Sequence, residues 1–342
     1  MIDLDEKKLE NFLLEQGISE YSCKKIAGDC SFRSYYRIDV AKSDERKISN
    51  ELANYLKQDE KNLILMFAPP KYEDIKPFIE IGALLLKNDL RAPEMFGRDF
   101  AEGFLLLEDF GDESFNKSMK KGDLKHEEIL YKNSIDCLIK ASKIQDLPSE
   151  IKKYNHAILF NELMVYVDWY LKFEKNVEFN IDESRKFKEI FFKLFDQLNW
   201  QDQSLVLRDY HADNLMFLNS ETGIKSVGLL DFQDALIGSS AYDLVSLVED
   251  ARRDVDLDLG EKLIEYYLQK NLEVDREKFL TDYKILSLQR NLKILGIFSR
   301  MARRNKQESY LKLIPRVVDH VLRRLSSDDI FKDVREFLRD LI

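Results

Sequence analysis

Cysteine is scarce in this chain of 342 residues, where only Cys23, Cys30 and Cys137 occur. No two of them form a Cys-x-x-Cys pair, so the sequence predicts neither a disulfide framework nor a thiolate zinc site. The longest apolar run is the six residues 63–68, far short of the roughly 20 needed to cross a membrane. The first residues, MIDLDEKKLENF, have no apolar signal-peptide core. We therefore expect a cytoplasmic protein with reduced thiols and no membrane partner.

An excess of positive charge is also lacking, because 53 Lys and Arg face 63 Asp and Glu and give a net charge of −10. Such a balance disfavours nucleic acid as a partner. With only 12 glycines and 6 prolines, the chain shows no long flexible linker. Its length corresponds to about two domains, or to one large domain with two lobes.

The first part of the chain alternates between strand and helix patterns. Aromatic alternation predicts a strand over 32–40, and apolar runs predict buried strands over 63–67 and 104–107. Apolar residues at helical spacing predict helices over 5–16 and 74–88. These patterns indicate a small, strand-rich lobe over residues 1–109.

From about residue 124 the pattern becomes mainly helical. Apolar stripes at helical spacing run through 129–139, 156–173 and 184–198. Two short apolar segments, 204–207 and 227–230, interrupt the helices and predict strands. We expect an α+β protein whose second, mainly helical lobe spans residues 110–342.

The sequence that carries chemistry lies directly after the first of these short segments. Residues 207–215 read Leu-Arg-Asp-Tyr-His-Ala-Asp-Asn-Leu, and Asp231 ends the next short strand 22 residues after Asp209. Phosphoryl transfer needs a carboxylate that accepts a hydroxyl proton, and oxygen ligands that hold Mg²⁺ on the phosphates. Asp209, Asn214 and Asp231 supply these groups in order.

This segment resembles the catalytic loop of the aminoglycoside phosphotransferase and choline-kinase-like family, which shares the two-lobed protein-kinase fold. The family loop reads His-Gly-Asp-x-x-x-x-Asn, whereas this chain has Leu207 and Arg208 before Asp209. The resemblance implies that ATP and Mg²⁺ are bound, that Asp209 is the catalytic base, and that Asn214 and Asp231 are the metal ligands. It also implies that Asp243 holds the loop through N–H groups.

Longer strings narrow the resemblance to bacterial kinases that phosphorylate the anomeric hydroxyl of N-acetylmuramate and N-acetylglucosamine. These strings run in order through roughly residues 28–300 and include 31–37, 106–111, 208–215, 230–235 and 242–255. The resemblance implies a small amino sugar as substrate, a sugar 1-phosphate as product, and a place in the recycling of cell-wall sugar.

The candidate nucleotide-binding residues lie in two segments of the first lobe: Ser31, Phe32, Arg33 and Arg37 over the phosphates, and Glu108 and Phe110 at the hinge that meets adenine. Backbone N–H groups of a tight turn can hold a phosphate, and arginine adds a forked donor. An ordinary hairpin is the alternative. The third strand has no lysine, unlike that of most kinase folds, and Arg33 or Arg37 could replace it.

The candidate substrate-binding residues are His211, Asp213, Asp234, Arg252, Arg253 and Arg290. N-acetylmuramate carries a lactyl carboxylate, which calls for a cation such as one of these arginines or Lys293. The alternatives are a histidine that packs within the loop and arginines in ordinary surface ion pairs.

Two other functions stay open, and we expect a monomer in each case. A kinase of the same fold could act on another small alcohol, such as an aminoglycoside or choline. A catalytically inactive kinase fold could serve as a binding module, which the missing lysine would favour and the three retained oxygen ligands oppose.

Overall fold

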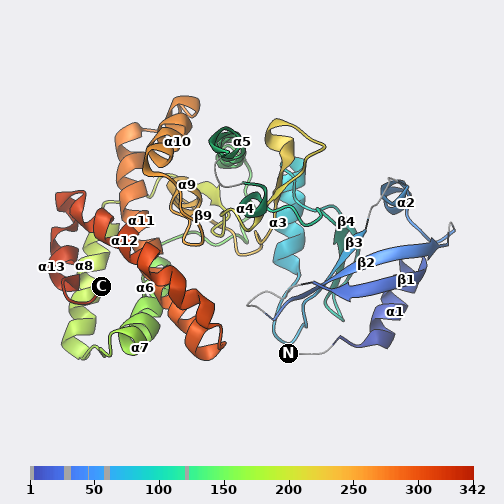
Figure 1. Ribbon diagram of the computed structural model, residues 1–342, viewed down its shortest axis with the longest axis horizontal. Helices are drawn as coiled ribbons and strands as arrows, with labels where there is room; N and C mark the ends of the chain where they lie inside the picture. The colour runs from blue at the N-terminus through green and yellow to red at the C-terminus, as the bar shows by residue number, and fades with distance from the viewer. Residues whose placement is uncertain (1–3, 27–31, 45, 58–61, 120–122) are drawn as a thin grey trace. The chain divides into compact units, whose positions relative to one another are not determined.

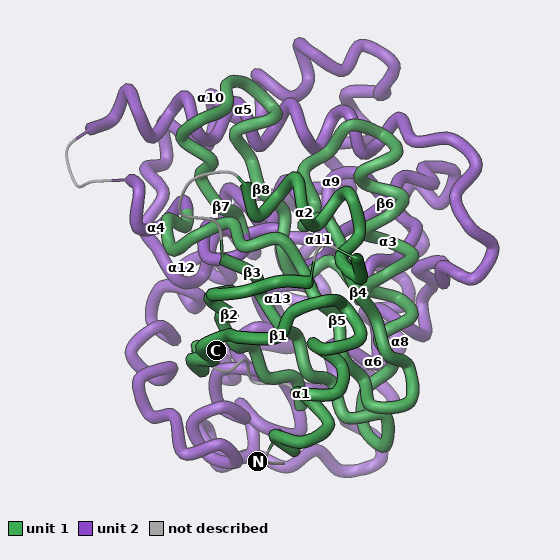
Figure 2. The backbone as a smooth tube through the Cα atoms, turned by 90° about the vertical axis from the view of Figure 1, so that its right-hand side faces the viewer, with its two compact units in different colours: residues 1–114, 215–234 green, residues 115–214, 235–342 purple. Residues whose placement is uncertain are grey.

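The computed structural model describes residues 4–26, 32–44, 46–57, 62–119 and 123–342. Contacts along the chain divide it into two compact units (Figure 2). Unit 1 consists of residues 1–114 and 215–234, and unit 2 of residues 115–214 and 235–342. The predicted lobe boundary at residue 109 lies near the first of these breaks, whereas the return of 215–234 to unit 1 was not foreseen.

Unit 1 contains a five-stranded antiparallel sheet in the order β1-β2-β3-β5-β4 (Figure 1). Its strands and helices have the following bounds: α1 Glu6–Glu15, β1 Ile18–Lys25, β2 Ser34–Ser43, α2 Asn50–Leu56, β3 Leu63–Phe67, α3 Lys76–Lys87, β4 Met95–Asp99 and β5 Phe104–Glu108. The sheet is thus built on the apolar runs in β3 and β5, which pair with each other at its centre.

Helix α1 packs on one face of this sheet and closes its core. Leu9, Phe12 and Leu13 are buried against a cluster that includes Ile38 of β2 and Leu65 of β3. Each deeply buried side chain of this size stabilises the fold by roughly 1.5–3 kcal/mol relative to an exposed one. The helix begins at Asp5, whose carboxylate accepts the N–H groups of the first turn.

A hairpin from the middle of the chain completes unit 1. Strands β7 (Leu215–Phe217) and β8 (Val227–Leu229) pair antiparallel, with the 3₁₀ turn η2 (Gly223–Ser226) between them. The N–H of Leu229 donates to the carbonyl of Arg91 at 2.7 Å, and the N–H of Phe217 donates to the carbonyl of Glu113 at 2.7 Å. These backbone bonds explain why residues 215–234 belong to the first unit.

Unit 2 is mainly helical. Its elements are α4 Phe115–Ser118, α5 Leu124–Ser142, α6 His156–Val165, the π-helix η1 Tyr166–Leu171, α7 Lys172–Glu174, α8 Ile181–Phe195, β6 Ser204–Val206, β9 Leu236–Gly238, α9 Ala241–Val248, α10 Leu257–Lys270, α11 Arg276–Arg304, η3 Glu308–Leu313, α12 Ile314–Ser326, η4 Asp329–Phe331 and α13 Lys332–Leu338.

Helix α11 runs through the middle of unit 2 (Figure 1). Most of its side chains are buried. It crosses the junction of α6 and η1 at close range, because a Cβ atom on Gly296 would lie 2.2 Å from the carbonyl oxygen of Val165. Glycine permits this approach of two backbones, since any side chain would force the helices apart. The crossing brings α11 and α6 together, and each helix contributes a charged side chain to the candidate active site.

The α+β class predicted from the sequence is confirmed by this architecture. The expected helices over 5–16 and 74–88 correspond to α1 and α3, and the strand over 63–67 has the predicted bounds. Over the described part of the chain, the helices are too short or too polar to cross a membrane.

Candidate active site

The predicted catalytic loop, residues 207–214, leaves strand β6 in unit 2 and is fixed by one buried carboxylate. Asp243 of α9 accepts the N–H of Leu207 at 2.6 Å on one oxygen and the N–H of Arg208 at 2.7 Å on the other. Burial raises the pKa of Asp243 to about 7, although these two donors oppose the shift. The role that the resemblance implied for Asp243 is therefore confirmed.

Asp209 follows this clamp directly, and its side chain is exposed at the end of a buried strand. Its carbonyl oxygen accepts the N–H of His211 at 3.2 Å and the side-chain amide of Asn214 at 3.0 Å. A further turn bond runs from the N–H of Asn214 to the carbonyl of His211. The backbone of Asp209 is thus held in place, while its carboxylate faces outward where a hydroxyl group can reach it.

Arg208 precedes Asp209 in a left-handed conformation, with φ of 72°. This region is costly for a residue with a side chain, and glycine stands at this point of the family loop. The main chain of Arg208 is held at both ends, because its N–H donates to Asp243 and its carbonyl accepts the hydroxyl of Ser246. The ion pair formed by its side chain offsets part of this backbone strain.

The ion pairs of Arg208 centre on Glu162 of α6. Glu162 Oε1 lies 2.5 Å from Arg208 Nη2 and 3.1 Å from Lys293 Nζ, and Oε2 accepts the Gln289 amide at 3.0 Å. The side chains of Glu162 and Lys293 are only 10% and 14% exposed. Burial would raise the pKa of Glu162, but Lys293 and Arg208 outweigh it and hold the pKa below its ordinary value. A buried cluster with one more cation than anion therefore adjoins the base.

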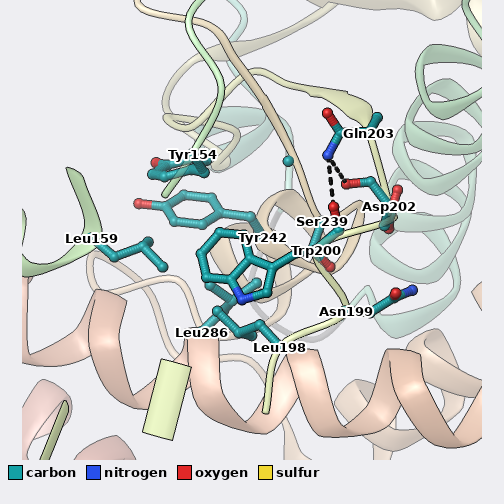
Figure 3. A pocket seen from close by; sticks show the side chains of 11 residues that line it. Tyr154, Leu159, Leu198, Asn199, Trp200, Asp202, Gln203, Ser239, Tyr242 and Leu286 are labelled. Carbon is teal, nitrogen blue, oxygen red and sulfur yellow. Dashed lines mark hydrogen bonds between the residues drawn. The ribbon is translucent and has the colours of Figure 1, made fainter. Parts of the chain in front are cut away.

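A small pocket lies beside this cluster (Figure 3). Tyr154 and Tyr242 line it with their rings stacked at 5.4 Å, next to Trp200. The hydroxyl of Tyr154 donates to Glu162 at 3.4 Å, and Lys293 donates to the hydroxyl of Tyr242 at 3.3 Å. The pocket thus contacts the charged cluster through these two tyrosine hydroxyl groups. The predicted catalytic residues do not line it.

His211 and Asp213 occupy different environments within the loop. The ring of His211 is buried with Nε2 3.3 Å from the Asn214 amide, and burial together with Arg252 and Arg290 lowers its pKa well below the ordinary value. Its imidazole is therefore neutral at pH 7. Asp213 is half-exposed, and its Oδ1 accepts the Asn116 amide at 2.8 Å. Asp213 is thus the more accessible of these two predicted substrate-binding residues.

The third predicted oxygen ligand, Asp231, lies in unit 1 after β8. Its Oδ1 accepts Arg33 Nη2 at 3.2 Å and the Gln233 amide at 3.0 Å. Arg33 is 8% exposed. The other candidate cation, Arg37, instead forms ion pairs with Asp109 and Asp112. Of the two arginines, Arg33 is the one that contacts Asp231.

Asn214 and Asp231 suit a hard cation. The Asn214 amide nitrogen binds the Asp209 carbonyl, which assigns the other end of the amide as its oxygen. Carboxylate and amide oxygens are ligands that Mg²⁺ prefers, and it takes few of them from the protein when phosphates supply the rest. The described residues contain no cluster of three or more His, Cys, Asp or Glu suited to a metal. Asn214 belongs to unit 2 and Asp231 to unit 1, so their joint action stays a prediction.

The remaining nucleotide-binding candidates are all in unit 1. Ser31 lies outside the described residues, and Phe32 is exposed and stacks on Tyr72 at 4.7 Å. Glu108 forms an ion pair with Arg91 at 2.7 Å, and the same guanidinium lies over the ring of Phe110. The side chain of Glu108 is thus occupied within the protein, and its N–H donates to the carbonyl of Glu94 at 2.8 Å. A hinge contact of Glu108 with adenine stays a prediction.

The predicted substrate-binding arginines are all in unit 2 and differ in their partners. Arg253 pairs with Glu127, and the buried Arg290 donates to the hydroxyl of Ser246. Arg252 lies beside Asp213 at the longer distance of 3.9 Å.

The last substrate-binding candidate, Asp234, lies in unit 1. It is exposed and accepts the Gln233 amide at 3.1 Å. Because Gln233 also donates to Asp231, this amide links the two carboxylates. A contact between Asp234 and substrate stays a prediction.

Sequence reasoning missed two anchors of this site. The ion pairs of Glu162 join three distant parts of the chain, and no local pattern marks them. Asp250 accepts the N–H of Ala212 at 3.2 Å and the N–H of Arg252 at 2.8 Å, and so ties the catalytic loop to the segment after α9. In the sequence Asp250 stands beside Glu249 after an apolar helix and within the resembling string 242–255, but no local pattern marks the N–H groups that it binds.

Comparisons with known proteins show what this chain is similar to. The family model described as "Phosphotransferase enzyme family" matches residues 22–280. A protein named N-acetylmuramate/N-acetylglucosamine kinase from Pseudomonas aeruginosa is 30% identical over 296 residues, which cover 85% of this chain and 80% of that protein. A kinase of the same name from Caulobacter vibrioides is 27% identical over 341 residues, covering 90% of this chain and 88% of its own.

Solved structures share the fold at lower identity. The microcompartment-associated aminopropanol kinase aligns with a TM-score of 0.61 at 16% identity, covering 95% of this chain and 99% of its own. The gentamicin complex of an aminoglycoside phosphotransferase aligns with a TM-score of 0.60 at 14% identity, covering 97% and 99%. Choline kinase from Cryptosporidium parvum aligns with a TM-score of 0.55 at 15% identity, covering 96% and 100%. The kinase-like two-lobed fold predicted from the sequence is confirmed.

The Glu162 cluster yields a stability prediction. Glu162→Gln leaves Arg208 and Lys293 as buried cations without their carboxylate, so we expect the free energy of unfolding to fall by about 3 kcal/mol. Urea denaturation followed by circular dichroism measures the change. The double variant Glu162→Gln, Lys293→Met removes one cation as well and should recover part of the loss. A double variant no more stable than the single one would contradict the assigned electrostatic coupling.

Proposed function

This chain belongs to the phosphotransferase enzyme family, and from that membership we propose that it transfers the γ-phosphoryl group of ATP to the anomeric hydroxyl of N-acetylmuramate or N-acetylglucosamine. The observation that carries the proposal is the exposed Asp209 carboxylate, fixed at the end of a buried strand by Asp243. Relatives that match at least 85% of this chain and bear the name of this kinase support the choice of sugar.

In the proposed reaction Asp209 accepts the proton of the anomeric hydroxyl. The oxygen attacks the γ-phosphorus, the bond from that phosphorus to the bridging oxygen breaks, and ADP leaves. The clamp on Leu207 and Arg208 fixes the position of the base before substrate arrives, so little ordering remains for the reactive step. Catalysis then depends mainly on positioning and on compensation of charge.

Asn214 and Asp231 are the proposed ligands of Mg²⁺, and Arg33 is the proposed replacement for the missing strand lysine. The ion when bound neutralises charge on the phosphates. Arg33 already faces a carboxylate, because it lies 3.2 Å from Asp231, and its forked donors suit phosphate oxygens equally well. Arg37 is held by two aspartates and is less suited to this task.

The remaining expectations concern the setting of the enzyme. The proposed substrates are small molecules, so nucleic acid and membrane are not needed as partners. A monomer that acts in the cytoplasm, where ATP is available, stays our prediction.

An assay of ADP release tests the proposed substrate. N-acetylmuramate, N-acetylglucosamine, choline and kanamycin are supplied in parallel with ATP and Mg²⁺. We expect turnover with at least one of the two amino sugars and none with choline or kanamycin. Turnover only with choline or kanamycin would contradict the sugar assignment. No turnover with any of the four would favour the inactive binding module.

The variant Asp209→Asn tests the proposed base. Loss of the proton acceptor should lower kcat by at least about a hundredfold, while ATP binding measured by calorimetry stays within a few-fold. Asp213→Asn serves as the matched control in the same loop, and we expect it to raise KM for the sugar more than it lowers kcat. Turnover retained by Asp209→Asn would show that another group takes the proton.

A further inference from the structure

A kinase that accepts N-acetylmuramate meets a negative charge that N-acetylglucosamine lacks. The two sugars differ by a lactyl ether on the ring carbon two positions from the anomeric carbon, and this ether ends in a carboxylate. A protein can distinguish such a pair by placing a cation beside the ring position that carries the ether while the base meets the anomeric hydroxyl. The inference below rests on the proposed function and asks which residue supplies that cation.

Most cations around the catalytic loop already have close partners inside unit 2. Arg208 and Lys293 share the carboxylate of Glu162 and are largely buried. Arg253 forms an ion pair with Glu127, and the two side chains are only 15% and 12% exposed. Removing any of these cations from its partner would leave a buried charge uncompensated, which is costly.

Arg290 is also committed. It is 4% exposed, and its Nη2 donates to the hydroxyl of Ser246 at 2.6 Å. That hydroxyl in turn donates to the carbonyl of Arg208. Arg290 therefore supports the catalytic loop through Ser246. A ligand carboxylate has little access to a guanidinium in this position.

Arg252 differs from all of these. Its side chain is 29% exposed, and its Nε lies 3.9 Å from Asp213 Oδ2, beyond hydrogen-bond distance. Within the described ranges its guanidinium makes no shorter contact with a carboxylate. The other oxygen of Asp213 accepts the Asn116 amide at 2.8 Å, so Asp213 is itself partly occupied. Arg252 therefore has donors available for an incoming anion.

The backbone of Arg252 is fixed relative to the catalytic loop. Asp250 is 2% exposed and bonds the N–H of Arg252 with one oxygen and the N–H of Ala212 with the other. The guanidinium lies 5.8 Å from the centre of the Phe298 ring, within the range of a cation–π contact. One carboxylate, which also binds the N–H of Ala212 in the catalytic loop, and one ring thus fix the position of Arg252.

We propose that Arg252 binds the lactyl carboxylate of N-acetylmuramate and so determines the preference between the two sugars. Its planar fork can meet both oxygens of a carboxylate. Asp213 lies beside the same guanidinium and is placed to accept a sugar hydroxyl.

The test compares specificity between the two sugars. The ratio of kcat/KM for N-acetylmuramate to kcat/KM for N-acetylglucosamine is measured for the wild-type protein and for Arg252→Met, which retains an unbranched side chain against Phe298. We expect the ratio to fall on the order of tenfold to a hundredfold, mainly through KM for N-acetylmuramate. Arg252→Lys keeps the charge and should restore part of the ratio. The methyl ester of N-acetylmuramate has no carboxylate charge. Its kcat/KM should therefore fall far less in Arg252→Met than the kcat/KM of the acid.

Three results would overturn the inference. Equal losses of kcat/KM with both sugars would assign Arg252 a structural role, and an unchanged kcat/KM with both sugars would exclude a contact with the carboxylate. Arg253→Met is the control of the same charge, because its arginine is tied to Glu127; an equal fall of the ratio in that variant would indicate a general field of positive charge.

The proposed function fails separately from this inference. If the wild-type protein phosphorylates neither sugar, the proposed function is wrong and the inference falls with it. If it phosphorylates both sugars and the ratio does not respond to Arg252→Met, only the inference is wrong. Turnover of N-acetylglucosamine alone would likewise overturn the inference and leave an amino-sugar kinase.

Discussion

The contact on which the rest of the site depends is that of one buried carboxylate with two successive backbone N–H groups. The carboxylate of Asp243 accepts hydrogen bonds from the N–H groups of Leu207 and Arg208. These two residues immediately precede the proposed base. Burying the carboxylate is costly, as its raised pKa shows, and the two charge-assisted hydrogen bonds offset part of that cost. As a result, the chain leaves β6 in a direction that exposes Asp209 while Leu207 and Tyr210 are buried.

Arg208 is where this constraint meets the charge of the site. The left-handed backbone that the clamp requires would suit glycine, and here an arginine adopts it. Its guanidinium reaches Glu162, which also binds Lys293, so three side chains from α6, α11 and the loop form one buried cluster. Arg208 thereby fixes the backbone next to Asp209 and links the catalytic loop to α6 and α11. Substitutions in α6 or α11 that disturb this cluster should therefore change the position of Asp209.

Sequence patterns were sufficient where the structure is local and insufficient where it joins distant segments. The run in β3, ended by two prolines, and the apolar spacing of α3 are strong local signals. Strands β7 and β9 were not predicted, and their pairing with the predicted strands β8 and β6 is what defines them. Glu162, Asp250 and Arg33 take their roles from partners 38 to 198 residues away, and no spacing rule predicts such pairs.

The central claim is that Asp209 directs ATP-dependent phosphorylation to the anomeric oxygen of an amino sugar. Phosphorus NMR of the product formed from N-acetylglucosamine tests it most directly, because coupling to ring protons identifies the esterified carbon. We expect the phosphate signal to correlate with the proton on the anomeric carbon in a two-dimensional phosphorus–proton spectrum. A signal split by the two protons of the exocyclic carbon would mean that another hydroxyl is the acceptor and would contradict the account.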